Sequence, residues 1–60
     1  MNPVGEMRDR VTDYFGGDAS KMLAWFQAKN PTLGDVSPNY MIAIGRVDRL
    51  RRFIEGALSA

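Results

Sequence analysis

The chain has 60 residues and a net charge of +1, so it is long enough for one domain, residues 1–60, and its charge is too small to indicate a polyanionic partner. It contains neither cysteine nor histidine, which excludes disulfides and thiolate metal sites and removes the commonest general base. No apolar run approaches the ~18–20 residues of a membrane span, and the N-terminus lacks the apolar segment of a secretory signal. We therefore expect a cytoplasmic protein without a membrane partner.

The first helix is predicted to begin at Pro3. Asn2 is a good N-cap, and proline suits the first helical position because its missing N–H has no partner in a helix. Beyond it, apolar residues recur at steps of three and four and share one helical face: Val4, Met7, Val11, Tyr14 and Phe15. Gly16 and Gly17 then end the helix, with Gly16 as its left-handed cap.

A second helix is predicted from Ala19 to Lys29, with Asp18 as its N-cap. It has a wide apolar arc, formed by Ala19, Met22, Leu23, Trp25 and Phe26. A helix with so wide an arc usually packs against more than one neighbour. We therefore expect this helix at the centre of the domain and Trp25 in the core.

An ordered connection follows the second helix. Asn30 precedes Pro31, and a residue before proline is pushed out of the helical region, so the second helix must end nearby. Gly34 allows a turn with positive φ. Leu33 and Val36 are apolar within this otherwise polar connection, and we expect both to pack into the core.

The third helix is expected from Pro38 to about Ile44, with Ser37 as its N-cap and Gly45 at its end. The alternative is one long helix that begins at Pro38 and tolerates Gly45 inside it, at a cost of about 1 kcal/mol.

The last helix is expected from about Arg46 to Leu58. Its apolar face consists of Val47, Leu50, Phe53, Ile54, Ala57 and Leu58. On the other side, Asp48 with Arg52 and Arg51 with Glu55 form two pairs at i, i+4 spacing. Together the four helices predict an all-α fold, a small four-helix domain with a short third helix.

Three short motifs surround the connection in a characteristic order: Ala24-Trp25-Phe26, Asn30-Pro31-Thr32-Leu33-Gly34 and Ser37-Pro38. In order and spacing they resemble the toxin-binding domain of Xre/MbcA/ParS-type bacterial antitoxins. That family typically has a helix ending in Ala-x-x-Trp-Leu, then Asn-Pro-x-Leu-Gly-Gly, then a Ser/Thr-Pro helix start. Upstream, Tyr14-Phe15-Gly16-Gly17-Asp18 is similar to the Phe-Gly-Asp that precedes these motifs in the family. The resemblance covers roughly residues 11–56.

The chain departs from this family at three points. Asp35 stands where the second glycine is usual, Val36 stands where an arginine is common, and the helix-turn-helix half that usually precedes the domain is absent. The resemblance implies a small non-catalytic inhibitor that binds a RES-type toxin, which degrades NAD in that family, and blocks its active site. Without the DNA-binding half, a stand-alone protein encoded by a phage or mobile element is expected, and inhibition of a different host protein is the alternative.

Four arginines of the last helix, Arg46, Arg49, Arg51 and Arg52, could form a nucleic-acid surface. They are spread around the helix, and two have acidic residues at pairing distance, so we favour a solvated face over phosphate binding. A weak nucleic-acid-binding protein remains the less favoured alternative. The aromatic residues at helical spacing are interpreted as core rather than as a base-stacking platform.

We expect no enzyme, no catalytic residue, no cofactor and no metal site. A catalytic reaction would need a nucleophile or a base, and only hydroxyl groups and dispersed carboxylates are present. No Asp-x-Asp-x-Asp loop for a hard cation occurs.

The surface expected to bind the partner combines the connection with the last helix. Tyr40 and Asn39, at the start of the third helix, are better candidates than Asp35, because tyrosine offers a large amphipathic contact area at modest entropy cost. The predicted partner-binding residues are Asn30, Asp35, Asn39, Tyr40, Arg49 and Arg52.

A homodimer is also expected, because a domain of this size cannot hide all its hydrophobic residues in one core. The last helix is the predicted contact, through Phe53, Ala57 and Leu58, in a two-fold arrangement.

Overall fold

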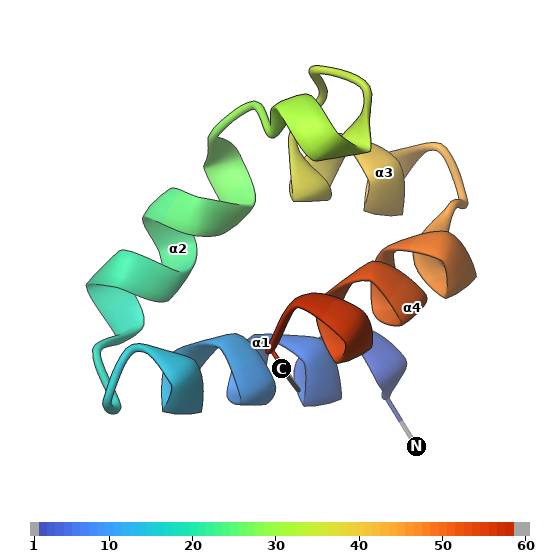
Figure 1. The fold of residues 1–60 in the computed structure, drawn as a ribbon. Helices are drawn as coiled ribbons and strands as arrows, with labels where there is room; N and C mark the ends of the chain where they lie inside the picture. Colours follow the sequence, from blue (N-terminus) through green and yellow to red (C-terminus); the bar gives the residue numbers. More distant parts are fainter. Residues whose placement is uncertain (1, 59–60) are drawn as a thin grey trace.

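A computed structural model describes residues 2–58 and has the predicted all-α architecture. Its helices are α1 (Pro3–Tyr14), α2 (Ala19–Gln27), α3 (Pro38–Ala43) and α4 (Val47–Leu58). A short 3₁₀ turn, η1 (Pro31–Leu33), lies in the connection between α2 and α3. Figure 1 shows the helices arranged as a ring, in which each packs against its neighbours in the chain and α4 returns to pack on α1.

Side-chain caps fix three of the helix starts, as predicted. The Asn2 side-chain oxygen accepts hydrogen bonds from the N–H groups of Val4 and Gly5, at 3.1 and 3.2 Å. The Asp18 carboxylate accepts one from Lys21 N–H at 3.1 Å. Ser37 Oγ accepts one from Tyr40 N–H at 3.0 Å. Each cap satisfies N–H groups that have no carbonyl partner within the helix, so these polar residues set where the helices begin.

The helix ends agree with the prediction at two places and differ at one. Gly16 and Gly45 have φ values of 69° and 77°, so α1 and α3 end at left-handed turns and the long continuous helix is excluded. The second helix ends at Gln27 rather than at Lys29, because Ala28 already has an extended ψ of 144°. The chain must leave the helix this early for Asn30 to pair with Val36 across the connection.

Among residues 2–58, seven buried hydrophobic residues form one core, and every helix contributes to it. They are Met7 and Val11 of α1, Phe26 of α2, Leu33 of η1, Met41 of α3, and Leu50 and Ile54 of α4. The expected burial of Leu33 is therefore confirmed, while Val36 is half-buried against the core.

The prediction of a central second helix is wrong. Only Phe26 of α2 is fully buried, whereas Trp25 is half-buried and Leu23 is 48% exposed. The reason is that α2 packs on α1 and α3 at its two sides, so part of its wide apolar arc faces solvent. Trp25 contacts the core from its edge, with its ring perpendicular to Phe26 and the ring centroids 5.1 Å apart.

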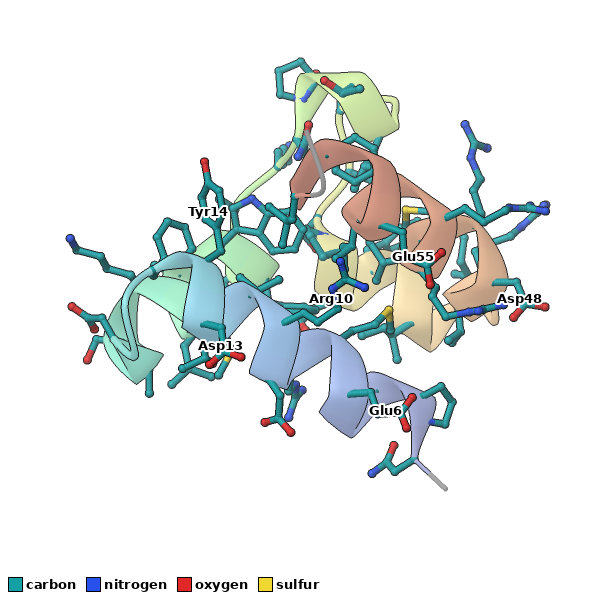
Figure 2. All side chains as sticks on the ribbon, turned by 60° about the horizontal axis from the view of Figure 1, so that its bottom comes forward. Glu6, Arg10, Asp13, Tyr14, Asp48 and Glu55 are labelled. Atoms are coloured by element: carbon teal, nitrogen blue, oxygen red, sulfur yellow. The ribbon has the colours of Figure 1, made fainter. Side chains whose placement is uncertain are left out.

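Tyr14 was expected on the inner face of the first helix, but the structure places it outside the core. Its side chain is 62% exposed and projects from the end of α1 (Figure 2). Phe15, the next residue, takes the half-buried position, and the two rings meet edge to face at 5.3 Å. The helix ends here, so the three- and four-residue spacing no longer fixes which aromatic ring turns inward.

Candidate functional site

The connection between α2 and α3 is a closed loop held by its own hydrogen bonds. Asn30 N–H donates to the Val36 carbonyl at 3.0 Å, and Asp35 N–H donates back to the Asn30 carbonyl at 3.1 Å. The Asn30 side-chain oxygen also accepts a hydrogen bond from Thr32 N–H at 2.9 Å and so caps η1. The side-chain oxygen of Asn30, a predicted partner contact, is therefore engaged in shaping the loop.

Two buried residues anchor this loop to the core. Leu33 lies in η1 and Pro38 begins α3, and both are buried. Because the apolar residues point inward, the polar side chains of the loop face solvent. Asp35, Asn39 and Tyr40 are all exposed, and Tyr40 retains 52% of its accessible surface. Three of the predicted partner-binding residues therefore lie on one ordered and accessible segment.

A groove of about 370 Å³ runs beside this segment. It is lined by the end of α2, the loop and the start of α3, through Gln27, Lys29, Asp35, Val36, Ser37 and Tyr40. The volume lies at the lower end of the range for ligand pockets. We define these six residues as the connection groove. Asp35 and Tyr40 were predicted as contacts, whereas Gln27 and Lys29 were not. The only signal for these two is their place within the three residues before Asn30-Pro31.

The remaining predicted contacts lie elsewhere. Asn39 is exposed but does not line the connection groove. Arg49 and Arg52 are exposed on α4 and form a separate surface. Of the predicted dimer contacts, Phe53 and Leu58 are half-buried within the chain and Ala57 is exposed. The structure thus brings Asp35 and Tyr40 together and leaves the arginines apart from them.

One expected ion pair on α4 is replaced by another. Arg51 pairs with Glu55 at 3.6 Å, as predicted, but it also pairs with Asp48 at 3.8 Å. Figure 2 shows Asp48 near the start of α4 and Glu55 closer to its end. Arg51 lies three residues after Asp48 and four before Glu55. Arg52 was expected to pair with Asp48, but the structure pairs Asp48 with Arg51 instead.

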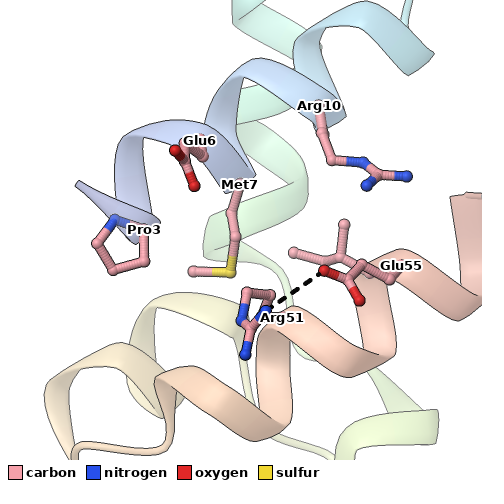
Figure 3. Close-up of a pocket in the computed structure, with 7 residues that line it drawn as sticks. Pro3, Glu6, Met7, Arg10, Arg51 and Glu55 are labelled. Atoms are coloured by element: carbon pink, nitrogen blue, oxygen red, sulfur yellow. Dashed lines mark ion pairs between the residues drawn. The ribbon is translucent and has the colours of Figure 1, made fainter. Parts of the chain in front are cut away.

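A second, smaller cleft of about 130 Å³ lies between α1 and α4 (Figure 3). Its apolar floor includes Met7 and Ile54, and charged side chains surround it: Glu6, Arg10, Arg51 and Glu55. This volume is below the several hundred Å³ typical of ligand pockets, so the cleft is too small to enclose a drug-sized ligand.

Backbone strain in the loop is confined to one non-glycine residue. Asp35 has a φ of 67°, in the left-handed region, directly after Gly34 with a φ of 85°. Left-handed backbone costs little for glycine and more for other residues, although aspartate tolerates it better than most. Asp35 therefore occupies a position that glycine suits better.

We expect Asp35→Gly to keep or slightly raise stability, by up to about 1 kcal/mol, because the strain at this φ disappears. Asp35→Val should lower it, since a β-branched residue is strained at positive φ. Thermal melts followed by circular dichroism compare the two variants. A valine variant as stable as the glycine variant would contradict the role of this backbone angle.

Within residues 2–58, no group of three or more carboxylates is placed to hold a metal ion. In the same part of the chain, no helix combines the length and apolar character needed to cross a bilayer. No protein-family model matches the sequence, and neither a curated protein nor a solved structure gives a match.

Proposed function

We propose that the chain is a non-catalytic protein-interaction module of the cytoplasm that binds and inhibits a partner protein in the manner of an antitoxin. A RES-type toxin is the partner that the resemblance implies. A different host protein, inhibited by a product of a phage or mobile element, is the alternative within the same class of function.

The observation that carries this proposal is the construction of the loop around the connection groove. Its backbone is closed by the Asn30–Val36 pairing and anchored by Leu33, so its shape is present before any partner arrives. A preformed surface avoids the entropy cost of ordering a loop on binding. Tyr40 adds a large exposed amphipathic side chain at the rim of the groove, a residue type enriched at protein interfaces.

A second observation bears on the resemblance itself. The resembled family usually has glycine at the position of Asp35, and the φ of 67° gives a physical reason for glycine there. Asp35 keeps that backbone while adding a carboxylate to the groove. The positive φ at this position supports the alignment of the loop with the family motif. The carboxylate of Asp35 fits a partner contact that differs from that of the family at this point.

We expect Tyr40→Ala to weaken partner binding by about tenfold or more, with little change in stability, because an exposed aromatic anchor contributes to binding rather than to the core. The bait is the purified chain, used for affinity capture from the native host. Bound proteins are identified by mass spectrometry, and their affinity is then measured with purified partner. If the partner is a RES-type enzyme, NAD degradation is the readout of inhibition.

Tyr14→Ala is the matched control, because Tyr14 is the other exposed tyrosine of the described chain and lies at the end of α1, outside the groove. It should leave partner binding unchanged. Equal affinities of wild type and Tyr40→Ala would exclude the connection groove as the contact.

The homodimer through Phe53, Ala57 and Leu58 stays a prediction. If folding and association are coupled, the melting temperature must rise with protein concentration. Phe53→Glu should then lower both the mass in light scattering and the melting temperature at high concentration. A monomer mass at high micromolar concentration, with a melt independent of concentration, would rule the dimer out.

A further inference from the structure

The ion pairs of α4 leave its arginines unequal. Arg51 engages both Asp48 and Glu55, the two carboxylates of this helix. Among residues 2–58, the structure gives no ion pair to Arg46, Arg49 or Arg52, and all three are exposed. We call these three residues the arginine stripe. Arg52 belongs to it because Asp48 pairs with Arg51 and not with Arg52.

The arginine stripe follows one side of the helix. Arg46 directly precedes α4 and its carbonyl accepts a hydrogen bond from Leu50 N–H at 3.1 Å, so it continues the helical path. Residues at steps of three are neighbours on a helix surface, and this stripe extends over about 9 Å. At 100° and about 1.5 Å per residue, Phe53 points in a direction between those of Arg46 and Arg49 but lies just beyond Arg52 along the axis. Gly56 lies about 6 Å beyond Arg52.

An apolar residue and a small residue follow the stripe at its C-terminal end. Phe53 is half-buried and packs against the core. Gly56 has open space where a side chain would project, so another chain can approach the backbone there. Arginines beside an aromatic residue, with room for a partner side chain, are typical of protein interfaces.

The stripe is not explained by the stability of α4. Two of its members, Arg46 and Arg49, lie at the N-terminus of the helix, where the helix dipole favours negative charge. Cations at this end oppose the dipole, and they gain no ion pair within the described chain that would offset this cost. The positions therefore suit an anionic partner that supplies the missing negative charge.

We propose that the arginine stripe docks an acidic protein segment, whose carboxylates pair with Arg46, Arg49 and Arg52 while an apolar side chain rests on Phe53. This rests on the proposed function and specifies the chemistry of the partner. Arginine and carboxylate form paired hydrogen bonds, and carboxylates one turn apart on a helix match arginines one turn apart here.

Nucleic acid fits this surface less well. Non-specific affinity for nucleic acid comes from the phosphates that a protein neutralises, and the stripe supplies only three cations. The exposed carboxylate of Asp48 lies on the same helix, and the chain as a whole has a net charge of only +1. Both would weaken attraction to a continuous row of phosphates.

The probe is a synthetic acidic helix of about three heptads, with leucine at the first and fourth positions, glutamate beside them and alanine elsewhere. It is titrated into the ¹⁵N-labelled chain while amide chemical shifts are recorded. A peptide with glutamine in place of glutamate is the charge control, and a DNA duplex of about 20 base pairs tests phosphate binding. We expect chemical-shift changes over residues 46–56 with the acidic peptide and with neither the glutamine peptide nor the DNA. Binding of the acidic peptide should weaken at higher salt.

Arg49→Glu and Lys21→Glu form a matched pair of variants. Each places glutamate at the third position of a helix, where acidic residues are favoured, and each changes the net charge equally. Figure 1 places the first turns of α2 and α4 at opposite sides of the molecule. Arg49→Glu should weaken the acidic peptide about tenfold, whereas Lys21→Glu should change it less than about twofold.

Four outcomes would overturn the proposal. The first is that the acidic peptide does not bind, as when a homodimer covers Phe53. The others are equal binding of the glutamine peptide, tighter binding of DNA with loss in Arg49→Glu, and chemical-shift changes that map outside α4. The Tyr40→Ala variant separates this test from that of the proposed function, because Tyr40 lies in the connection groove. If Tyr40→Ala loses the captured partner while no acidic peptide binds, the proposed function stands and the arginine stripe has no such role.

Discussion

Replacing Phe26 with alanine is expected to leave the chain largely unfolded. Phe26 is 1% exposed and is the only fully buried residue of α2. Its ring meets Trp25 edge to face, and the Arg8 guanidinium lies 5.8 Å from its centroid. Truncating a buried phenylalanine typically costs about 3–5 kcal/mol. A domain of this length has only about 3–9 kcal/mol of stability, so the loss is comparable with the whole.

Circular dichroism at 222 nm, recorded during thermal unfolding, measures the effect. Leu23→Ala is the control, because Leu23 lies on the same helix and is 48% exposed. It should change stability by less than about 1 kcal/mol. Two variants with equal melting temperatures would show that α2 does not hold the core through Phe26.

The second large effect is expected for Leu33→Ala. Leu33 is buried in η1 and connects the loop to the core. Removing a buried leucine side chain costs about 2–5 kcal/mol, which corresponds to at least about 10 °C in the melting temperature of so small a domain. The loop itself should also become less stable, because its hydrogen bonds depend on Leu33 holding it against the core.

Amide hydrogen exchange distinguishes the local effect from the global one. The N–H groups of Asn30 and Asp35 donate across the loop and should be protected in the wild type. In Leu33→Ala they should exchange faster than the general loss of stability explains. Thr32→Ala, at an exposed neighbouring position, should leave them protected. Uniform acceleration of all amides in Leu33→Ala would mean that the loop has no separate anchoring.

Local chemistry in the sequence was sufficient to predict where the helices lie. Asn2, Asp18 and Ser37 each cap a helix as expected, and Gly45 separates α3 from α4. Such signals act over three or four residues, so they are complete within the local sequence. The apolar face of α4 was also predictable, because Leu50 and Ile54 are spaced one turn apart and both are buried.

Burial of individual side chains could not be predicted in the same way. Trp25 and Phe26 both belong to the apolar arc of α2, and which of them is enclosed depends on how α1 and α3 approach this helix. The ion pair of Arg51 with Glu55 was predicted, but its second pair, with Asp48, was not. Periodicity places a residue on a face, but packing between helices decides what covers that face.

The connection groove was predicted in part. Pro31, Gly34 and Ser37 mark an ordered loop from sequence, and Tyr40 follows as an exposed residue of the next helix. The contribution of Lys29 depends on the early end of α2, which results from the pairing of Asn30 with Val36. That pairing joins residues six positions apart and has no signature in composition or spacing.

The packing of α4 on α1 has a consequence for synthesis on the ribosome. Met7 and Val11 emerge about forty residues before Leu50 and Ile54, the core residues that α4 supplies. Until α4 has left the exit tunnel, the inner face of α1 has no cover on that side. A nascent chain arrested within the connection would therefore expose its first helix to chaperones and proteases, and only synthesis through α4 would protect it.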